Sequence, residues 1–171
     1  MDGAVRLYER AIQLVPDQLP ALDAGAHVLV LRGRHAEALG FVQRIRRLAP
    51  EEARFAVAEA QLHLELDDAA GAARSLAESV PAWKSDAAAA LTAAEILVLR
   101  CRAFEVAGEI LPGVADAHPA QFQLRYLAAL ALHSEGRSEE ARSALETASA
   151  LGGDRAHIGR FLQETRPPRG E

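Results

Sequence analysis

The sequence predicts an all-α protein made of antiparallel helix pairs that follow one another along the chain. Half of the 171 residues are hydrophobic, only 5% are aromatic, and alanine is the commonest residue. This composition favours helices over strands, because alanine and leucine are strong helix formers and β-branched residues are not enriched. In addition, a pattern of small, large and helix-breaking residues recurs about every 34 residues, as in chains that stack small structural units.

The repeat is clearest at an alanine that recurs near the start of every second expected helix. Four residues after this alanine every copy has a large apolar residue, and twelve residues after it four of the five copies have proline or glycine. Five residues before it two copies have Gly33 and Gly136, which suit a tight turn with positive φ. We call the recurring alanines the anchor alanines. They are Ala4, Ala38, Ala72, Ala107 and Ala141, with steps of 34, 34, 35 and 34 residues.

This pattern resembles the tetratricopeptide repeat, a 34-residue unit of two antiparallel helices, A and B, over nearly the whole chain. The resemblance implies a right-handed α–α superhelix with four full helical hairpins, an N-terminal half repeat and a C-terminal capping helix, all in one domain over residues 1–165. The expected boundaries are 1–18 for the half repeat, 19–52, 53–86, 88–121 and 122–155 for the repeats, 156–165 for the cap and 166–171 for a frayed tail.

The periodicity also predicts where the individual helices lie. We expect Trp83, in the longest connector, to cover exposed core. In repeat 88–121, Glu95 stands where the other repeats have alanine on helix A, and Pro112 is expected to kink or end helix B near Leu111. The expected pairs are 18–31 with 34–48, 51–66 with 69–80, 85–100 with 103–115, and 120–134 with 138–150, with single helices near 3–15 and 154–164.

Charge and hydropathy exclude several kinds of partner. The formal net charge of −5 argues against a general electrostatic grip on nucleic acid or on an anionic membrane. No apolar run is long enough to suggest a transmembrane helix, and Asp2 and Glu9 lie where a signal peptide needs a basic start and an apolar core. We therefore expect no nucleic-acid or membrane partner. We also expect a cytoplasmic protein, unless the chain is a fragment of a longer one.

The sequence contains no pattern typical of an active site. It has no glycine-rich phosphate loop and none of the common hydrolase or zinc-protease motifs. Its six histidines never stand three or four residues apart, so no single helix presents a pair of metal ligands. Cys101 is the only cysteine and is interpreted as a structural thiol. We therefore expect no catalytic residues, no bound metal and no cofactor.

The resemblance implies that the A helices line a concave groove that holds a peptide or a partner helix. Transferring that face by spacing gives a set of groove residues that is more apolar than a solvated surface. For Leu64, Leu99 and Leu127 the alternative is that they pack within their own helix pairs. The predicted groove residues are Asp23, His27, Arg54, Val57, Gln61, Leu64, Thr92, Ile96, Leu99, Tyr126, Leu130 and His133.

These features predict a non-enzymatic protein–protein interaction module. The chain begins with a lone B-type helix whose Tyr8 and Ile12 lack a packing partner, so either more repeats lie upstream or this helix pairs with a second copy in a homodimer. Two alternative functions follow: an accessory domain cut from a larger bacterial enzyme of the transferase type, or a self-assembling scaffold.

Overall fold

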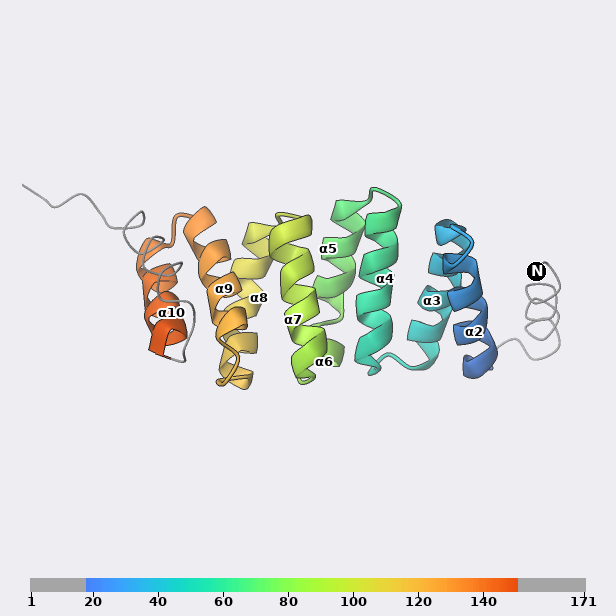
Figure 1. The fold of residues 1–171 in the computed structure, drawn as a ribbon, viewed down its shortest axis with the longest axis horizontal. Helices are drawn as coiled ribbons and strands as arrows, with labels where there is room; N and C mark the ends of the chain where they lie inside the picture. Colours follow the sequence, from blue (N-terminus) through green and yellow to red (C-terminus); the bar gives the residue numbers. More distant parts are fainter. Residues whose placement is uncertain (1–17, 151–171) are drawn as a thin grey trace, which may run out of the picture. The chain divides into compact units, whose positions relative to one another are not determined.

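The computed structural model describes residues 18–150, and helices make up most of this range (Figure 1). No strand occurs among these residues. The chain divides after Trp83 into two compact units, which we describe separately as unit 1 and unit 2. The predicted half repeat with Tyr8 and Ile12, the cap at 156–165 and the tail lie outside the described residues.

Each unit contains two hairpins of an A and a B helix, at nearly the predicted positions. In Figure 1 the A helices α2 and α4 of unit 1 lie in front of its B helices α3 and α5, and α7 and α9 of unit 2 lie in front of α8. Unit 1 contains α2 (Leu19–Val30), α3 (His35–Leu48), α4 (Ala53–Glu65), α5 (Ala69–Glu78) and the short α6 (Val80–Trp83). Unit 2 contains α7 (Ala87–Glu95), the π-helical segment η1 (Ile96–Arg100), α8 (Phe104–Ala117), α9 (Phe122–Ser134) and α10 (Ser138–Ala150).

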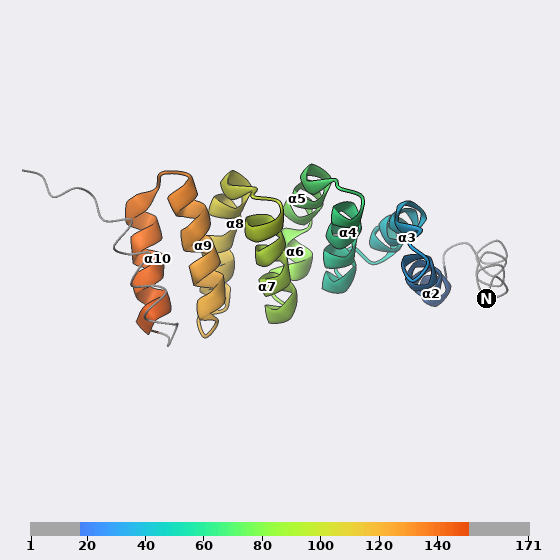
Figure 2. The same ribbon diagram turned by 45° about the horizontal axis from the view of Figure 1, so that its top comes forward.

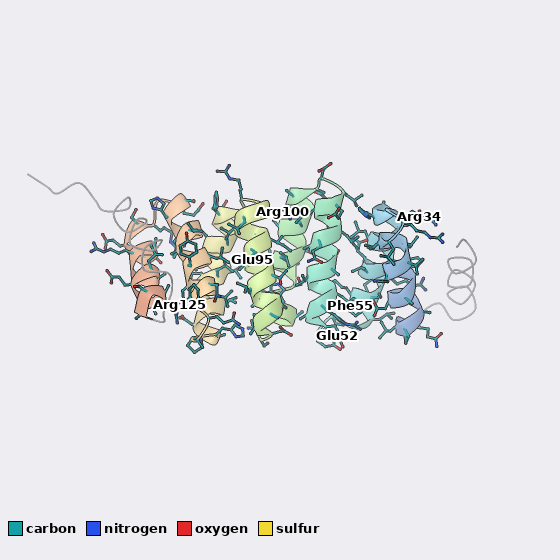
Figure 3. The ribbon with its side chains drawn as sticks, viewed as in Figure 1. Arg34, Glu52, Phe55, Glu95, Arg100 and Arg125 are labelled. Atoms are coloured by element: carbon teal, nitrogen blue, oxygen red, sulfur yellow. The ribbon has the colours of Figure 1, made fainter. Side chains whose placement is uncertain are left out.

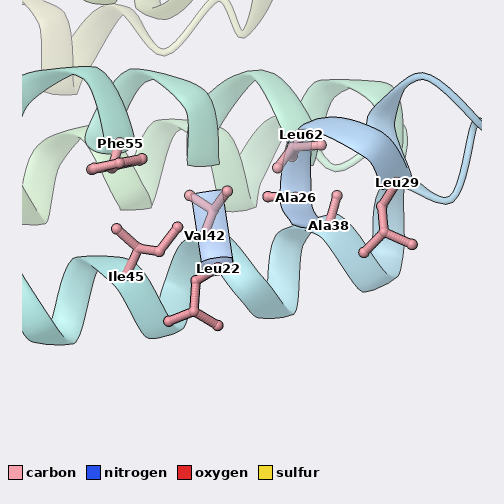
Figure 4. Close-up of a cluster of buried hydrophobic side chains, with 8 residues drawn as sticks. All are labelled: Leu22, Ala26, Leu29, Ala38, Val42, Ile45, Phe55 and Leu62. Carbon is pink, nitrogen blue, oxygen red and sulfur yellow. The ribbon is translucent and has the colours of Figure 1, made fainter. Parts of the chain in front are cut away.

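The core of unit 1 follows the predicted columns of small and large apolar residues. The alanines Ala26 and Ala38 lie where α2 meets α3 and allow the two helices to approach closely (Figure 4). Leu22 and Ile45 are fully buried beside them, and Phe55 contributes from α4. Truncating a buried leucine of this kind to alanine costs about 2–5 kcal/mol, so these columns hold the hairpin together.

Unit 1 also contains a buried polar link between its hairpins. Arg46 of α3 donates from Nη1 to Oε2 of Glu59 on α4 and to Oγ of Ser75 on α5, the latter at 3.1 Å. Glu59 and Ser75 are only 7% and 5% exposed. A buried carboxylate is strongly destabilising when its partner is removed, so Arg46 is required once Glu59 is present.

The predicted connector around Trp83 is partly helical, because its first part forms α6 at the end of unit 1. Trp83 at the end of α6 is fully buried, as expected of a residue that covers core. Its indole Nε1 donates a hydrogen bond to the carbonyl oxygen of Leu76 at 3.0 Å. The indole therefore buries its large ring without leaving its N–H unpaired.

The A–B turns of all four described hairpins place one residue at positive φ in the same position. The residue five positions before each anchor alanine has positive φ: Gly33 at 69°, Asp67 at 57°, Arg102 at 52° and Gly136 at 78°. In three hairpins the next amide donates to a carbonyl five residues back, for example Arg34 to Leu29 at 2.9 Å. This is the Schellman arrangement that ends many α-helices. Only two of the four positions are glycine, so Asp67 and Arg102 adopt a conformation that L-residues disfavour.

The 35-residue step has a local cause in helix A of the third described hairpin. In the other three hairpins, helix A begins 19 positions before the anchor alanine of helix B. In the third hairpin it begins 20 positions before, at Ala87, with the anchor at Ala107. The segment η1 takes up the additional residue, because the amide of Cys101 donates to the carbonyl of Ile96, five residues back, at 2.8 Å. A π-helical turn holds one more residue than an α-helical turn.

This π-helical segment corrects the predicted register of helix A. Counted from the start of α7, the position of the small residues Ala26, Ala60 and Ala129 belongs to Ala94, which is fully buried. Glu95 is exposed and takes the next position, which corresponds to His27 and Gln61. The prediction that Glu95 replaces the small residue is therefore wrong. It aligned helix A by counting back from the alanine in helix B, and that count crosses the additional residue.

Pro112 was expected to kink or end helix B near Leu111, and the expected end at this position is wrong. Helix α8 continues through Pro112 to Ala117. Proline has no amide hydrogen, so the carbonyl of Gly108, four residues earlier, loses its helical donor. Nη1 of Arg137 donates to this carbonyl at 3.3 Å. A Cβ built on Gly108 would lie 3.8 Å from the same Nη1, which is an ordinary contact distance. The α9–α10 turn thus supplies the bond that Pro112 removes.

Candidate functional site

The candidate site consists of the outward surfaces of the A helices in each unit. We call them the A face of unit 1, on α2 and α4, and the A face of unit 2, on α7, η1 and α9. Helices α7 and α9 contact one another directly, and η1 also contacts α9. The A face of unit 2 is therefore a surface shared by consecutive repeats, as the resemblance implied for a groove lined by A helices.

On the A face of unit 1 the structure brings two predicted groove residues together. Nη1 of Arg54 on α4 lies 3.0 Å from Oδ2 of Asp23 on α2, and its Nε lies 3.4 Å from Oε2 of Glu52. The guanidinium also stacks over the ring of Phe55, at 4.1 Å from the ring centroid. Arg54 and Asp23 are 64% and 42% exposed. They form a solvated ion pair that a charged ligand can exchange at low cost.

The other predicted residues of this face differ in how much surface they offer. His27 and Gln61 are exposed, and Leu64 is half-buried. Val57 is only 9% exposed, so most of its side chain packs inside the unit. The polar positions of this face are thus more accessible than its predicted apolar ones.

On the A face of unit 2 the predicted residues lie on both α7–η1 and α9. Leu99 is 58% exposed, whereas Leu127 is 5% exposed and packs inside the unit. Tyr126, Leu130 and His133 of α9 are half-buried. Burial raises the pKa of the Tyr126 hydroxyl above its ordinary value, so this phenol stays neutral. The predicted residue Thr92 is half-buried, and its hydroxyl donates to the carbonyl of Ala88 at 3.0 Å.

The π-helical segment changes which residue of α7–η1 faces outward. Ile96, a predicted groove residue, is only 5% exposed. The neighbouring Glu95 is exposed at the register of His27, Gln61 and Leu130. Sequence reasoning missed Glu95 because it aligned helix A from the wrong end. The signal that could have found it was the single 35-residue step.

Charge on the A face of unit 2 is uncompensated. Glu95 and Arg100 lie near the two ends of η1, and Figure 3 shows both side chains. Neither forms an ion pair with another residue in the range 18–150. Leu99 stands between them in the sequence. The face therefore presents an apolar residue together with charges of both signs, all open to solvent.

Exposed apolar residues gather at the ends of the A helices. Val30 and Leu31 at the end of α2 are 40% and 73% exposed, and Leu66 directly after α4 is 39% exposed. Leu99 occupies the comparable end of η1. Single exposed apolar residues are common on protein surfaces, and a contiguous apolar patch is what marks a surface that a partner covers.

Neither a metal centre nor a membrane span emerges from the part of the chain that the structure describes. No group of three or more histidine, cysteine, aspartate or glutamate side chains converges there in a way that could hold a metal ion. None of the helices between residues 18 and 150 combines the length and the apolar character needed to cross a bilayer.

Comparisons with known proteins show which solved structures have a similar fold. No protein-family model matches the sequence, and no curated protein matches it either. Among solved structures, YrrB, described as a TPR protein with an unusual peptide-binding site, has a TM-score of 0.64 at 17% identity, over 95% of this chain and 83% of YrrB. MamA from Desulfovibrio magneticus gives 0.62 at 18% identity, over 86% of this chain and 82% of MamA.

A tetratricopeptide repeat protein from Parabacteroides merdae gives a TM-score of 0.52 at 15% identity, over 96% of this chain and 77% of that protein. Identities this low carry no information on ligands, but the likeness extends over most of each chain. Together with the stride, the paired helices and the shared turn geometry, it shows that the chain has the fold of the tetratricopeptide-repeat proteins.

Proposed function

We propose that the chain is a protein–protein interaction module that binds a peptide segment along the A faces of its repeats. The observation that carries the proposal is Leu99, which is 58% exposed in a segment that also exposes Glu95 and Arg100. An exposed apolar side chain between unpaired charges provides both area to bury and charges to pair. YrrB, with its peptide-binding site, has the same fold.

The A faces favour a mixed ligand over a purely apolar one. Arg54 and Asp23 provide exchangeable polar contacts on unit 1, and the half-buried Tyr126 and Leu130 provide apolar contacts on unit 2. A segment with one large apolar residue flanked by charged residues matches Leu99 and its neighbours. The two other functions raised by the sequence depend on regions beyond residues 18–150.

The test is a selection of peptides from a random display library on the full chain, followed by affinity measurements on variants. Leu99→Asp should weaken the selected peptides at least about tenfold, because truncating a central apolar contact commonly costs more than 1 kcal/mol. Leu48→Asp is the matched control, since Leu48 is 42% exposed at the end of a B helix.

Far-UV circular dichroism checks that both variants keep their helices. Selected peptides that bind Leu99→Asp as tightly as the original chain, or a greater loss in Leu48→Asp, would contradict the proposal. A library that yields no binder to the full chain would do so as well.

A further inference from the structure

Unit 2 lacks the polar link that joins the hairpins of unit 1. Counted from the anchor alanines, Arg46, Glu59 and Ser75 of unit 1 correspond to Ala115, Ala128 and Ala144 of unit 2. Arginine, glutamate and serine fill the junction of α3, α4 and α5, where Arg46 contacts the other two. In unit 2 the three corresponding side chains are reduced to methyl groups.

An open cleft of about 260 Å³ lies at this place in unit 2. Helices α8, α9 and α10 run side by side in both views (Figure 1 and Figure 2), and the cleft opens between them. The three alanines form part of its wall together with Pro112 and Leu132. Its volume lies below the roughly 300–1,000 Å³ of typical small-molecule sites, so it suits a single side chain.

The cleft contains a guanidinium that is only partly satisfied. Arg125 of α9 lines it, and the side chain is 17% exposed (Figure 3). Nη1 donates to Oδ1 of Asp116 at 3.1 Å, but that carboxylate is 73% exposed and mostly solvated. Nε of Arg125 is buried and has no acceptor among the described residues. A buried donor without an acceptor costs free energy that an incoming acceptor recovers.

Arg46, the buried arginine of unit 1, shows what is different. Nε of Arg46 is also buried without an acceptor within the described range, but its Nη1 has Glu59, a carboxylate that is itself buried. Arg125 has no buried carboxylate. Its register position corresponds to Ala56 in unit 1, so this arginine reaches the cleft from helix A and not from helix B.

The remaining charges around the cleft are compensated. Glu140 lines it but accepts two hydrogen bonds from Arg137, one from Nε at 2.8 Å and one from Nη2 at 2.6 Å. This Nε–Nη2 pair is the fork with which arginine binds carboxylates. The same edge of Arg125 includes its unpaired Nε. Asp116 balances the charge of Arg125 without occupying Nε.

We propose that the cleft between α8, α9 and α10 binds a glutamate or aspartate side chain of a protein partner. The partner carboxylate pairs with the Nε edge of Arg125, and its methylene groups fill the space left by Ala115, Ala128 and Ala144. The partner thereby supplies in trans the buried carboxylate that Glu59 supplies to Arg46 in unit 1. This site is separate from the A face, because Arg125, Ala128 and Leu132 lie on a different side of α9 from Tyr126, Leu130 and His133.

The test uses the full chain and two short peptides with blocked ends, acetyl-AAEAA-amide and acetyl-AAQAA-amide. NMR spectra follow the methyl groups of the three cleft alanines and the Nε–H group of Arg125 during titration. The glutamate peptide should shift these signals and bind about tenfold more tightly than the glutamine peptide, the effect expected of a charge-assisted hydrogen bond. Equal shifts with both peptides, or none up to their solubility limit, would overturn the proposal.

Two variants and one small anion test whether binding depends on the arginine fork and on the open space of the cleft. Arg125→Lys keeps the positive charge but loses the fork, so the glutamate peptide should fall to the affinity of the glutamine peptide. Ala144→Leu fills the cleft and should weaken binding with Arg125 intact. Unchanged binding in either folded variant overturns the proposal, and so does acetate binding as tightly as the glutamate peptide. Leu99→Asp should leave this titration unchanged, which distinguishes failure here from failure of the proposed A-face function.

Discussion

The third and fourth described hairpins lie next to each other in unit 2 but differ in the regularity of their helices and turns. In the fourth hairpin, α9 and α10 are uninterrupted α-helices joined at Gly136, which has positive φ. In the third, helix A contains the π-helical segment η1, the turn places Arg102 at positive φ, and helix B contains Pro112. All three irregularities fit within the repeat because the turn and the anchor alanine keep their places.

The comparison shows which parts of a repeat tolerate change. An additional residue enters helix A because a π-helical turn accommodates it before the A–B turn begins. A proline enters helix B because Arg137, from the neighbouring turn, donates to the carbonyl that the proline leaves unpaired. The first compensation is made inside the third hairpin itself, by the bond from Cys101 to Ile96, whereas the second depends on Arg137 of the fourth hairpin.

The largest effect should come from exchanging the proline between the two hairpins. Glu146 in α10 has the same register as Pro112 in α8. Glu146→Pro should destabilise the chain by about 3 kcal/mol, because no arginine stands ready to satisfy the freed carbonyl of Arg142. Pro112→Ala should stabilise it by about 1–2 kcal/mol, since it restores the helical hydrogen bond. Urea unfolding measures both, and a cost below about 1 kcal/mol for Glu146→Pro would contradict the role assigned to Arg137.

A smaller effect should follow from exchanging the turn residues. Gly136→Ala places a Cβ at a φ of 78° and should cost about 1 kcal/mol. Arg102→Gly relieves the same conformation in the third hairpin and should stabilise the chain by about 0.5 kcal/mol, after the greater freedom of glycine in the unfolded chain is subtracted. Thermal unfolding of both variants checks the opposite signs, and a loss of stability in Arg102→Gly would be inconsistent with strain at this turn.

The smallest effect concerns the pH dependence of the fourth hairpin. Hydrogen bonds from Arg137 hold the pKa of Glu140 below its usual value of 4.5. A carboxylate with a lowered pKa stabilises the folded chain above its unfolded pKa, and this contribution is lost as the pH falls through the folded pKa. Glu140→Gln should therefore lose less stability than the original chain when the pH falls below 4.5.

Glu139→Gln is the control for this measurement, because Glu139 has no ion-pair partner within the described range. Its stability should follow the original chain as the pH is lowered during denaturant titrations. An unchanged pH dependence in Glu140→Gln would show that the pair with Arg137 adds nothing to stability.

The sequence predicted the repeated hairpins, most helix limits and the core because these follow from periodic apolar positions. Leu76, Leu111 and Leu145, which stand four residues after their anchor alanines, are fully buried. Leu22 of helix A is fully buried as well. The register of α7 could not be obtained in the same way, because a single additional residue has no chemical signature and only the structure shows that η1 contains it. The continuation of α8 through Pro112 depends on Arg137, 25 positions further along the chain, a contact that local propensity does not contain.

The candidate site was predictable in part. The pairing of Asp23 with Arg54 follows from placing successive A helices side by side, and both residues were in the predicted groove set. The exposure of Glu95 and the burial of Ile96 both depend on η1. The single 35-residue step indicates that a residue has been added but does not say where in helix A it lies. The cleft beside Arg125 depends on three alanines whose common place becomes visible only when two units are compared in three dimensions.

The role of η1 as an insertion is tested most directly by a pair of single-residue deletions, one in each A helix of unit 2. Deleting Ile96 removes the additional residue and restores a 34-residue step, so we predict a cooperatively folded chain with unchanged helix content and with η1 converted to α-helix. Deleting Leu130 from the regular α9 turns every following side chain by about 100° relative to the core, and unit 2 should unfold. Urea unfolding followed by circular dichroism distinguishes the two outcomes. If the Ile96 deletion disrupts unit 2 as severely as the Leu130 deletion does, η1 is not an insertion within a standard repeat and the register assigned to helix A is wrong.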